Sequence, residues 1–204
     1  MLIEIDPVYP RKRQIQRAVE IIRDGGLVVY PTDTTYGIGC DLFDRRAIDR
    51  VYSVKRKNPK TPLSFICHDL KDLSHYALVP NNAYKMMRRL LPGPYTFILP
   101  ATREVPRILM TKRKTVGIRV PNNAICLALL EELGHPIISS SVRRGEGEIF
   151  TDPAEIHQQL GHQIDLVIDG GILVSEQSTV VDLSDGPPVI LRQGKGDISS
   201  IGLD

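Results

Sequence analysis

Residues 27–39 read LVVYPTDTTYGIG, and this stretch decides the fold class. Its first four residues form an apolar run, which predicts a short buried strand that the following proline closes. A polar, glycine-containing loop is expected over residues 32–39. Immediately upstream, apolar residues at helical spacing end at a glycine pair, so the pattern predicts a helix over residues 14–24. A helix that leads into a buried strand is typical of an α/β protein.

The rest of the chain continues this mixture of helices and strands. Further helices are predicted at residues 45–54, 69–76, 81–90, 122–133 and 153–160. Further strands are predicted at residues 63–67, 95–99, 115–120, 136–140, 165–168, 179–183 and 189–192. Helices and strands are interleaved in the first two thirds and strands dominate at the end, which favours a mixed sheet. No linker or repeat divides the chain, so we expect one α/β domain over residues 1–204.

The composition excludes several classes of protein. With 204 residues, 42% of them hydrophobic and 25% charged, the chain is too apolar for a disordered protein. No stretch approaches the roughly 18 apolar residues of a membrane span, and the N-terminus lacks the basic region of a secretory signal. Cys40, Cys67 and Cys126 are an odd number without CxxC spacing, which argues against a disulfide framework. We therefore expect a cytoplasmic protein with no membrane partner.

The net charge of +2 conceals an asymmetry along the chain. Residues 1–119 carry 22 Lys and Arg against 11 Asp and Glu, whereas residues 120–204 carry 4 against 13. The basic residues gather in short clusters, among them residues 11–13, 55–60 and 112–114. Such a distribution can focus positive potential on one surface, so an anionic partner is expected.

Familiar catalytic and metal-binding signatures are missing. The sequence has no GxxxxGK[ST] loop and no GxSxG elbow, and the glycines of residues 37–39 leave the dinucleotide fingerprint incomplete. The five histidines form no HExxH motif and pair with no cysteine at zinc spacing, so no metal site is predicted.

Polar residues at the ends of predicted strands are the candidates for a binding site. Thr34 lies in the loop after the first strand, where hydroxyls and glycines suit a polar ligand, although for this loop taken alone an ordinary Thr/Asp turn is the favoured interpretation. On the predicted strand 115–120, Thr115, Gly117 and Arg119 share one face. Arg119 can therefore bind a carboxylate or phosphate beside a hydroxyl, and a structural ion pair is the alternative.

Two further segments carry the same kind of signal. Lys55 and Lys57 lie near a helix end, where both can reach one phosphate chain if the backbone is extended; a solvated basic face is the alternative. The apolar strand 136–140 passes into three serines, of which Ser139 and Ser141 form a hydroxyl lining for a pocket mouth.

Taken in order, these segments resemble the YrdC-like family, which comprises the threonylcarbamoyl-AMP synthases of tRNA modification and their relatives. The motifs are PTDTTYGIG (31–39), Lys-x-Lys (55–57), PLSF (62–65), PGPYTFIL (92–99), TVGIRVP (115–121), PIISSS (136–141), STVVDL (178–183) and ILRQG (190–194). The resemblance covers a core from about residue 11 to about residue 196, which is nearly the whole chain.

The resemblance implies a fold, ligands and a set of site residues. The fold is an α/β domain with a twisted mixed sheet around a positively charged concave cavity. The synthases make threonylcarbamoyl-AMP and pyrophosphate from ATP, L-threonine and bicarbonate, so ATP or AMP is the implied ligand, with magnesium and no tightly bound metal. The resemblance places Thr34, Arg119 and Thr179 at the threonine. It places Lys55, Lys57, Thr115, Ser139, Ser141 and Arg192 along the nucleotide.

Three departures from the synthases point to the family's YciO-type branch. The basic motif ends in Lys57 where synthases have arginine, and Arg143 replaces an asparagine. Ile66 stands where synthases have a histidine. Lysine keeps the charge of arginine but loses its bidentate geometry. No side chain is assigned as catalytic, because the family's chemistry depends on positioning and charge rather than on a nucleophile.

Three hypotheses about function remain open at this stage. The first is a nucleotide-binding protein that also binds double-stranded RNA or tRNA, through the basic clusters Lys55, Arg56, Lys57, Lys112, Arg113 and Lys114. Aromatic residues are 5% of the chain and tryptophan is absent, which favours backbone recognition of structured RNA over base stacking. The second is an active threonylcarbamoyl-AMP synthase that uses L-threonine and bicarbonate. The third is an enzyme acting on another adenylate.

Overall fold

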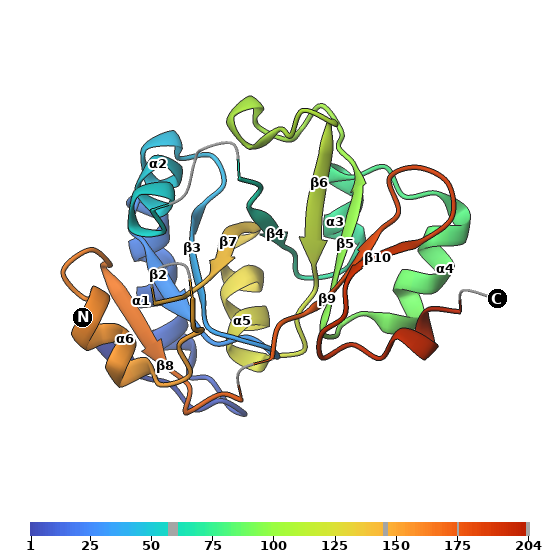
Figure 1. Cartoon of the computed structure of the whole chain (residues 1–204). Helices are drawn as coiled ribbons and strands as arrows, with labels where there is room; N and C mark the ends of the chain where they lie inside the picture. Colours follow the sequence, from blue (N-terminus) through green and yellow to red (C-terminus); the bar gives the residue numbers. More distant parts are fainter. Residues whose placement is uncertain (57–60, 145–146, 175, 203–204) are drawn as a thin grey trace.

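The strands form one open sheet in which parallel and antiparallel pairs are mixed (Figure 1). The computed structural model describes residues 1–56, 61–144, 147–174 and 176–202. Within these ranges ten strands follow the order β1-β8-β2-β3-β7-β4-β6-β5-β9-β10. They are β1 (Leu2–Glu4), β2 (Val28–Tyr30), β3 (Gly37–Asp41), β4 (Ser64–Ile66), β5 (Tyr95–Pro100), β6 (Thr115–Arg119), β7 (Ile137–Ser141), β8 (Leu166–Asp169), β9 (Thr179–Asp182) and β10 (Val189–Arg192). The predicted α/β domain with a mixed sheet is confirmed.

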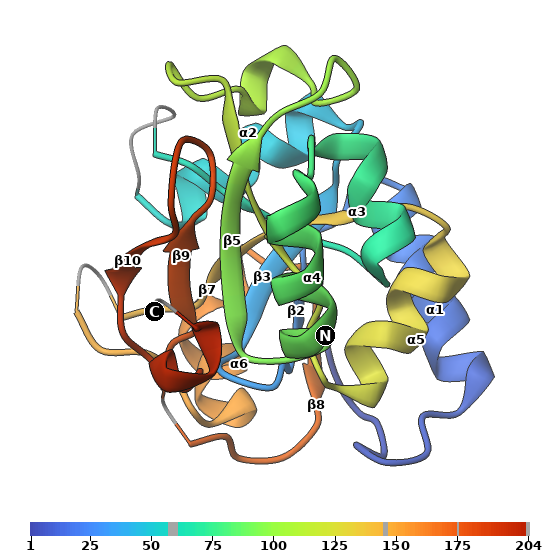
Figure 2. The same ribbon diagram turned by 90° about the vertical axis from the view of Figure 1, so that its right-hand side faces the viewer.

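Six α-helices of the described part of the chain pack on this sheet. They are α1 (Lys12–Arg23), α2 (Arg45–Val54), α3 (Leu70–Tyr76), α4 (Asn81–Leu90), α5 (Ala124–Leu133) and α6 (Pro153–Leu160). Side-chain caps begin several of them: Asp44 accepts from the backbone amides of Arg46 and Ala47, at 2.8 and 3.0 Å. Figure 2 shows α1 and α5 side by side.

Alternate residues of the strands enter two separate apolar cores. On β2, Val28 and Tyr30 pack into one core and Val29 into the other. The first core is completed by α1 and α5, for example by Val19 and Leu129, which are both fully buried. The second core takes its helical residues from α2, α3, α4 and α6. The two faces of the sheet are therefore covered by different sets of helices.

The predicted loop over residues 32–39 is wrong at its end, because Gly37 begins strand β3. This strand pairs antiparallel with both β2 and β7, so it lies inside the sheet. The glycines are needed because the ring of Tyr30 lies against them: a Cβ on Gly39 would be 2.9 Å from Tyr30 Cε1. Glycine carries no apolar side chain, so the strand has no visible hydrophobic alternation. The three-residue edge strand β1, which pairs with β8, was also not predicted.

No helix among the described residues has the length and apolar character needed to span a membrane.

Candidate functional site

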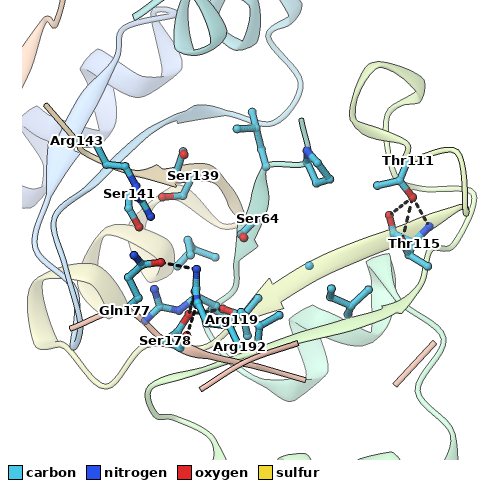
Figure 3. A pocket seen from close by; sticks show the side chains of 18 residues that line it. Ser64, Thr111, Thr115, Arg119, Ser139, Ser141, Arg143, Gln177, Ser178 and Arg192 are labelled. Atoms are coloured by element: carbon cyan, nitrogen blue, oxygen red, sulfur yellow. Dashed lines mark hydrogen bonds between the residues drawn. The ribbon is translucent and has the colours of Figure 1, made fainter. Parts of the chain in front are cut away.

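Half of one sheet face carries polar side chains in place of an apolar core. Ile66 on β4 packs into the core beneath α1 and α5 and also reaches an open cavity, which Ser64, two residues earlier, lines as well. The cavity has a volume of about 260 Å³ and draws its lining from β4, β5, β6, β7, β9 and β10. We call it the arginine cavity, after Arg119, Arg143 and Arg192 (Figure 3). No aspartate or glutamate is found in its lining within the described residues.

Strand β6 supplies one wall, as its alternation predicted. Thr115, Gly117 and Arg119 all line the cavity, so the inference that they share one face is confirmed. The strand is held between β4 and β5, where Gly117 pairs with both Ser64 and Ile98. A Cβ on Gly117 would meet its nearest atoms only at 3.6 Å, so the floor of the cavity is open here.

Arg119 is both an ion-pair partner and a cavity residue. Its Nη2 donates to Asp33 Oδ1 at 2.7 Å and to Thr34 Oγ1 at 2.9 Å, and both charged side chains are less than 10% exposed. The structural ion pair considered from the sequence is therefore present. However, Arg119 Nε is buried and has no hydrogen-bond partner among the described residues. Buried donors without a partner are uncommon in proteins, so the hydrogen bonding of Arg119 is incomplete within the described residues.

Arg143 and Arg192 bring two more guanidinium groups to the same cavity. Arg192 Nε donates to the carbonyl of Ser178 at 3.0 Å, Nη2 donates to Ser178 Oγ at 3.1 Å, and Nη1 donates to Gln177 Oε1. Figure 3 shows Arg192 beside Gln177 and Ser178, and Arg143 beside Ser141. Partial burial lowers the pKa of Arg192, and the charges of Arg143 and Arg119 lower it further. The three cations repel one another, so an anion bound between them is stabilised.

Hydroxyl groups complete the lining. Ser139 and Ser141 come from β7, and Ser141 Oγ accepts a hydrogen bond from Thr35 Oγ1 at 3.2 Å. Thr115 Oγ1 shares a 2.9 Å hydrogen bond with Thr111 Oγ1. Serine and threonine hydroxyls donate and accept, so they suit the polar edges of a sugar or a phosphate.

The remaining predicted ligand residues lie at different distances from this lining. Thr34 is buried and accepts from Arg119, so it adjoins the cavity without lining it. Thr179 is fully buried, and its hydroxyl is occupied by the carbonyl of Gly196 at 2.6 Å and the amide of Gly194 at 3.0 Å. Its placement at a threonine ligand stays a prediction, and the structure gives its hydroxyl a role in joining β9 to the segment after β10.

The basic clusters lie around the cavity rather than within it. Lys55, at the end of α2, donates to the carbonyl of Ser141, and Arg56 follows it at the surface. Lys57 lies outside the described residues. Lys112 and Lys114 are exposed next to Thr111 of the lining. Between them, Arg113 pairs with Asp182 at 3.0 Å, so its charge is largely offset.

Several lining residues were not assigned from the sequence. Ser64 and Ser178 lie within quoted motifs and Gln177 directly precedes one, but none of the three was predicted as a ligand. Strand alternation could have identified Ser178, because alternate residues of a strand point to the same face. Ser178 and Val180 both line the cavity, so the intervening Thr179 points away from it. Asp33, which holds Arg119, had no distinguishing signal, since its partner lies 86 positions along the chain.

Comparison with known proteins agrees with this architecture. The family model Sua5/YciO/YrdC, described as "Telomere recombination", matches residues 20–194. The chain belongs to this family. It is 46% identical over 197 residues to YciO of Escherichia coli, with 95% of each chain covered. The crystal structure of E. coli YciO superposes with a TM-score of 0.95, at 44% identity and 98% coverage of both chains. The predicted YrdC-like membership and the similarity to YciO are thus confirmed.

The Sua5/YciO/YrdC family also includes synthases. The threonylcarbamoyl-AMP synthase of Pyrococcus abyssi is 33% identical over 183 residues, which are 89% of this chain and 54% of that protein. A crystal structure of P. abyssi Sua5 complexed with L-threonine superposes with a TM-score of 0.89, at 32% identity, over 95% of this chain and 57% of that one. This protein is therefore related to threonylcarbamoyl-AMP synthases, with a higher identity to YciO.

Proposed function

We propose that this protein binds an adenine nucleotide, ATP or AMP, in the arginine cavity and binds structured RNA or tRNA through the basic residues around it. The observation that carries the proposal is the convergence of three guanidinium groups on a cavity with hydroxyls and no carboxylate among its described lining residues. Guanidinium groups bind phosphate bidentately, and Arg119 Nε offers a further buried donor.

The site residues divide into two groups under this proposal. Arg192, Thr115, Ser139 and Ser141 contact the nucleotide, while Arg119 with Thr34 faces the threonine-like part of a ligand. L-threonine bound to P. abyssi Sua5 supports a small amino acid as a second ligand of the same cavity. Magnesium, when present, accompanies the nucleotide and is held by phosphate oxygens and water, because the described lining offers it no carboxylate.

RNA binding is assigned to backbone phosphates. Lys112 and Lys114 are exposed beside the cavity, and Lys55 and Arg56 lie at the end of α2. Cations of this kind bind phosphates whatever the base sequence. The logarithm of the binding constant then falls linearly with the logarithm of the salt concentration, with a slope of roughly −0.7 to −0.9 for each phosphate neutralised. Arg113 contributes less than its neighbours, because Asp182 already pairs with it.

RNA binding is tested by filter binding of a tRNA at several salt concentrations. We expect a steep salt dependence, and Lys112→Gln with Lys114→Gln is expected to weaken binding while leaving AMP affinity unchanged. Lys71→Gln with Lys85→Gln removes the same charge from exposed positions elsewhere and serves as the control. Affinity for tRNA that does not change with salt concentration contradicts RNA binding through phosphates. If both double variants lose the same affinity for tRNA, Lys112 and Lys114 are not the contact surface.

The alternative activity, synthesis of threonylcarbamoyl-AMP, is tested in the same preparation. The protein is incubated with ATP, magnesium, L-threonine and labelled bicarbonate, and pyrophosphate and threonylcarbamoyl-AMP are measured. We expect nucleotide binding without synthase turnover. Turnover at the rate of a synthase measured in parallel means that the replacements at Arg143 and Ile66 are tolerated, and the enzymatic alternative then replaces the binding function.

A further inference from the structure

A second cavity adjoins the arginine cavity and shares one residue with it. It has a volume of about 290 Å³ and lies where the end of α2, the segment after β7 and the end of α6 meet; we call it the α2–α6 cavity. Its base is apolar, with Val54, Phe150 and Leu160. Arg143 lines both cavities.

The rim of the α2–α6 cavity is strongly basic. Its charged lining residues are Lys55, Arg56, Arg143 and Arg144, and His162 and two glutamines add polar groups. Within the described residues no aspartate or glutamate lines it. Four cationic side chains around one small cavity produce a concentrated positive potential, which attracts a compact anion.

The four cations are not equally engaged by the protein. Arg144 is neutralised, since it pairs with Glu155 and with Glu148 at 3.6 Å and stacks over Phe150 at 5.1 Å. Lys55 donates to the carbonyl of Ser141. In contrast, Arg56 and Arg143 form no ion pair with any carboxylate of the described residues, and Arg143 has a long 3.4 Å hydrogen bond to the carbonyl of Gly147. The charges of two guanidinium groups in this cavity, those of Arg56 and Arg143, are therefore not offset by a carboxylate of the described residues.

The backbone holds Arg56 at the rim. Its φ of 48° lies in the left-handed region, and its amide donates to the carbonyl of Ser53 at 3.0 Å. This conformation is uncommon for a residue with a side chain, and it ends α2 so that Arg56 contributes to the cavity lining rather than continuing the helix. The local backbone thus places Arg56 on the side of the cavity formed by α2.

We propose that the α2–α6 cavity is a phosphate-binding site, distinct from the arginine cavity, with Arg56 and Arg143 as its main ligands. Arg143 contacts the anions of both cavities, so the two sites have one cation in common. The ligand is a phosphate group, either free or part of an RNA backbone. This inference goes beyond the proposed nucleotide site and does not require that site to be occupied.

The direct test is a calorimetric titration of inorganic phosphate into the full-length protein, alone and saturated with AMP. We expect one phosphate to bind to the protein saturated with AMP, in which the arginine cavity is already occupied. Arg56→Gln is expected to weaken phosphate binding about tenfold, the scale of one lost charged hydrogen-bonding partner. Arg45→Gln removes an exposed arginine at the other end of α2 and is expected to change nothing. Arg143→Gln is expected to weaken both phosphate and AMP.

The outcomes separate this inference from the proposed function. If AMP does not bind but phosphate binding is still weakened by Arg56→Gln and not by Arg192→Gln, the second site stands and the nucleotide proposal fails. Loss of phosphate binding when AMP is saturating, or equal affinity in the wild type and Arg56→Gln, overturns the second site. A short RNA duplex that displaces phosphate identifies the backbone as the source, and a duplex that does not displace it identifies a free anion.

Discussion

The two halves of one sheet face differ in what covers them. Where β2, β8 and the start of β7 carry Val28, Leu166 and Ile137, the helices α1 and α5 cover the sheet and form a closed core. Where β6 carries Thr115 and Arg119 at the equivalent alternate positions, the face is open and forms the arginine cavity. The same backbone pattern therefore builds a core or a binding site, depending on whether every second residue is apolar or polar.

The largest effect is expected at Arg119, which joins the two halves through Asp33. Arg119→Met leaves a buried carboxylate without its cation, and we expect a loss of about 3–5 kcal/mol in the free energy of unfolding, measured by urea denaturation, together with a loss of L-threonine binding. Adding Asp33→Asn removes the buried charge. The double variant is expected to regain much of the stability and none of the affinity; recovered affinity contradicts a role of Arg119 in ligand binding.

The next effect concerns the covered half alone. Leu129 on α5 is fully buried, so Leu129→Ala is expected to lower the free energy of unfolding by about 2–5 kcal/mol. Ser64→Ala, on the cavity wall, is expected to change it by less than about 0.5 kcal/mol. Urea denaturation of both variants measures the contrast, and equal losses would show that the cavity wall is part of the packed core.

Two glycines on the sheet sharpen the same contrast. A Cβ on Gly39 would lie 2.5 Å from Ile137 Cγ2 and 2.8 Å from the carbonyl of Ile138, so Gly39→Ala is expected to cost about 1–3 kcal/mol of stability. A Cβ on Gly117 would meet nothing closer than 3.6 Å, so Gly117→Ala is expected to fold normally. It places a methyl group in the arginine cavity, and AMP affinity is expected to fall. If Gly117→Ala is destabilised, or if its affinity for AMP is unchanged, Gly117 does not form the floor of the AMP-binding cavity.

The sequence predicted some strands of the sheet correctly and missed others. Alternation on β6 predicted the shared face of Thr115, Gly117 and Arg119, because a strand has a fixed period of two. Strand β3 was mistaken for a loop because Gly37 and Gly39 give no hydrophobic signal, although their lack of a side chain is what admits Tyr30.

Contacts between residues far apart in the chain could not be predicted from the sequence. The partners Arg119 and Asp33 are brought together only by the tertiary fold, and no local pattern encodes their distance. Thr179 was carried over from the family motif, and the contacts of its hydroxyl with Gly194 and Gly196 became visible only in three dimensions. The family resemblance supplied the general location of the site, and strand alternation supplied the side of the sheet.

The smallest effect is a pH dependence in the covered half, where His135 Nε2 lies 3.5 Å from Asp41 Oδ2. Burial lowers the pKa of His135, but hydrogen bonds to Asp41 and Pro136 and the charge of Asp41 outweigh it, so the net pKa is raised. This contribution is complete below the unfolded value of about 6.5 and is lost as the pH rises through the raised value. We expect the pair to contribute less than about 1 kcal/mol to the free energy of unfolding.

Thermal unfolding of the wild type and of His135→Gln between about pH 6 and pH 9 measures this contribution. Burial raises the pKa of Asp41, whereas hydrogen bonds from His135 and Phe43 outweigh it and lower the net pKa, so its contribution is lost only as the pH falls through that lowered value. The wild type is expected to lose stability as the pH rises across this range, and the variant to lose less. Identical pH profiles contradict the contribution of the pair.

The central claim is that the open half of the sheet face binds the phosphate of a nucleotide through its guanidinium groups. Calorimetric titration of AMP and of adenosine into the same preparation tests it most directly, because the two ligands differ only in the phosphate. We predict that AMP binds and that adenosine binds at least about tenfold more weakly, the equivalent of about 1.4 kcal/mol. Equal affinity for the two, or no binding of AMP, would contradict the claim.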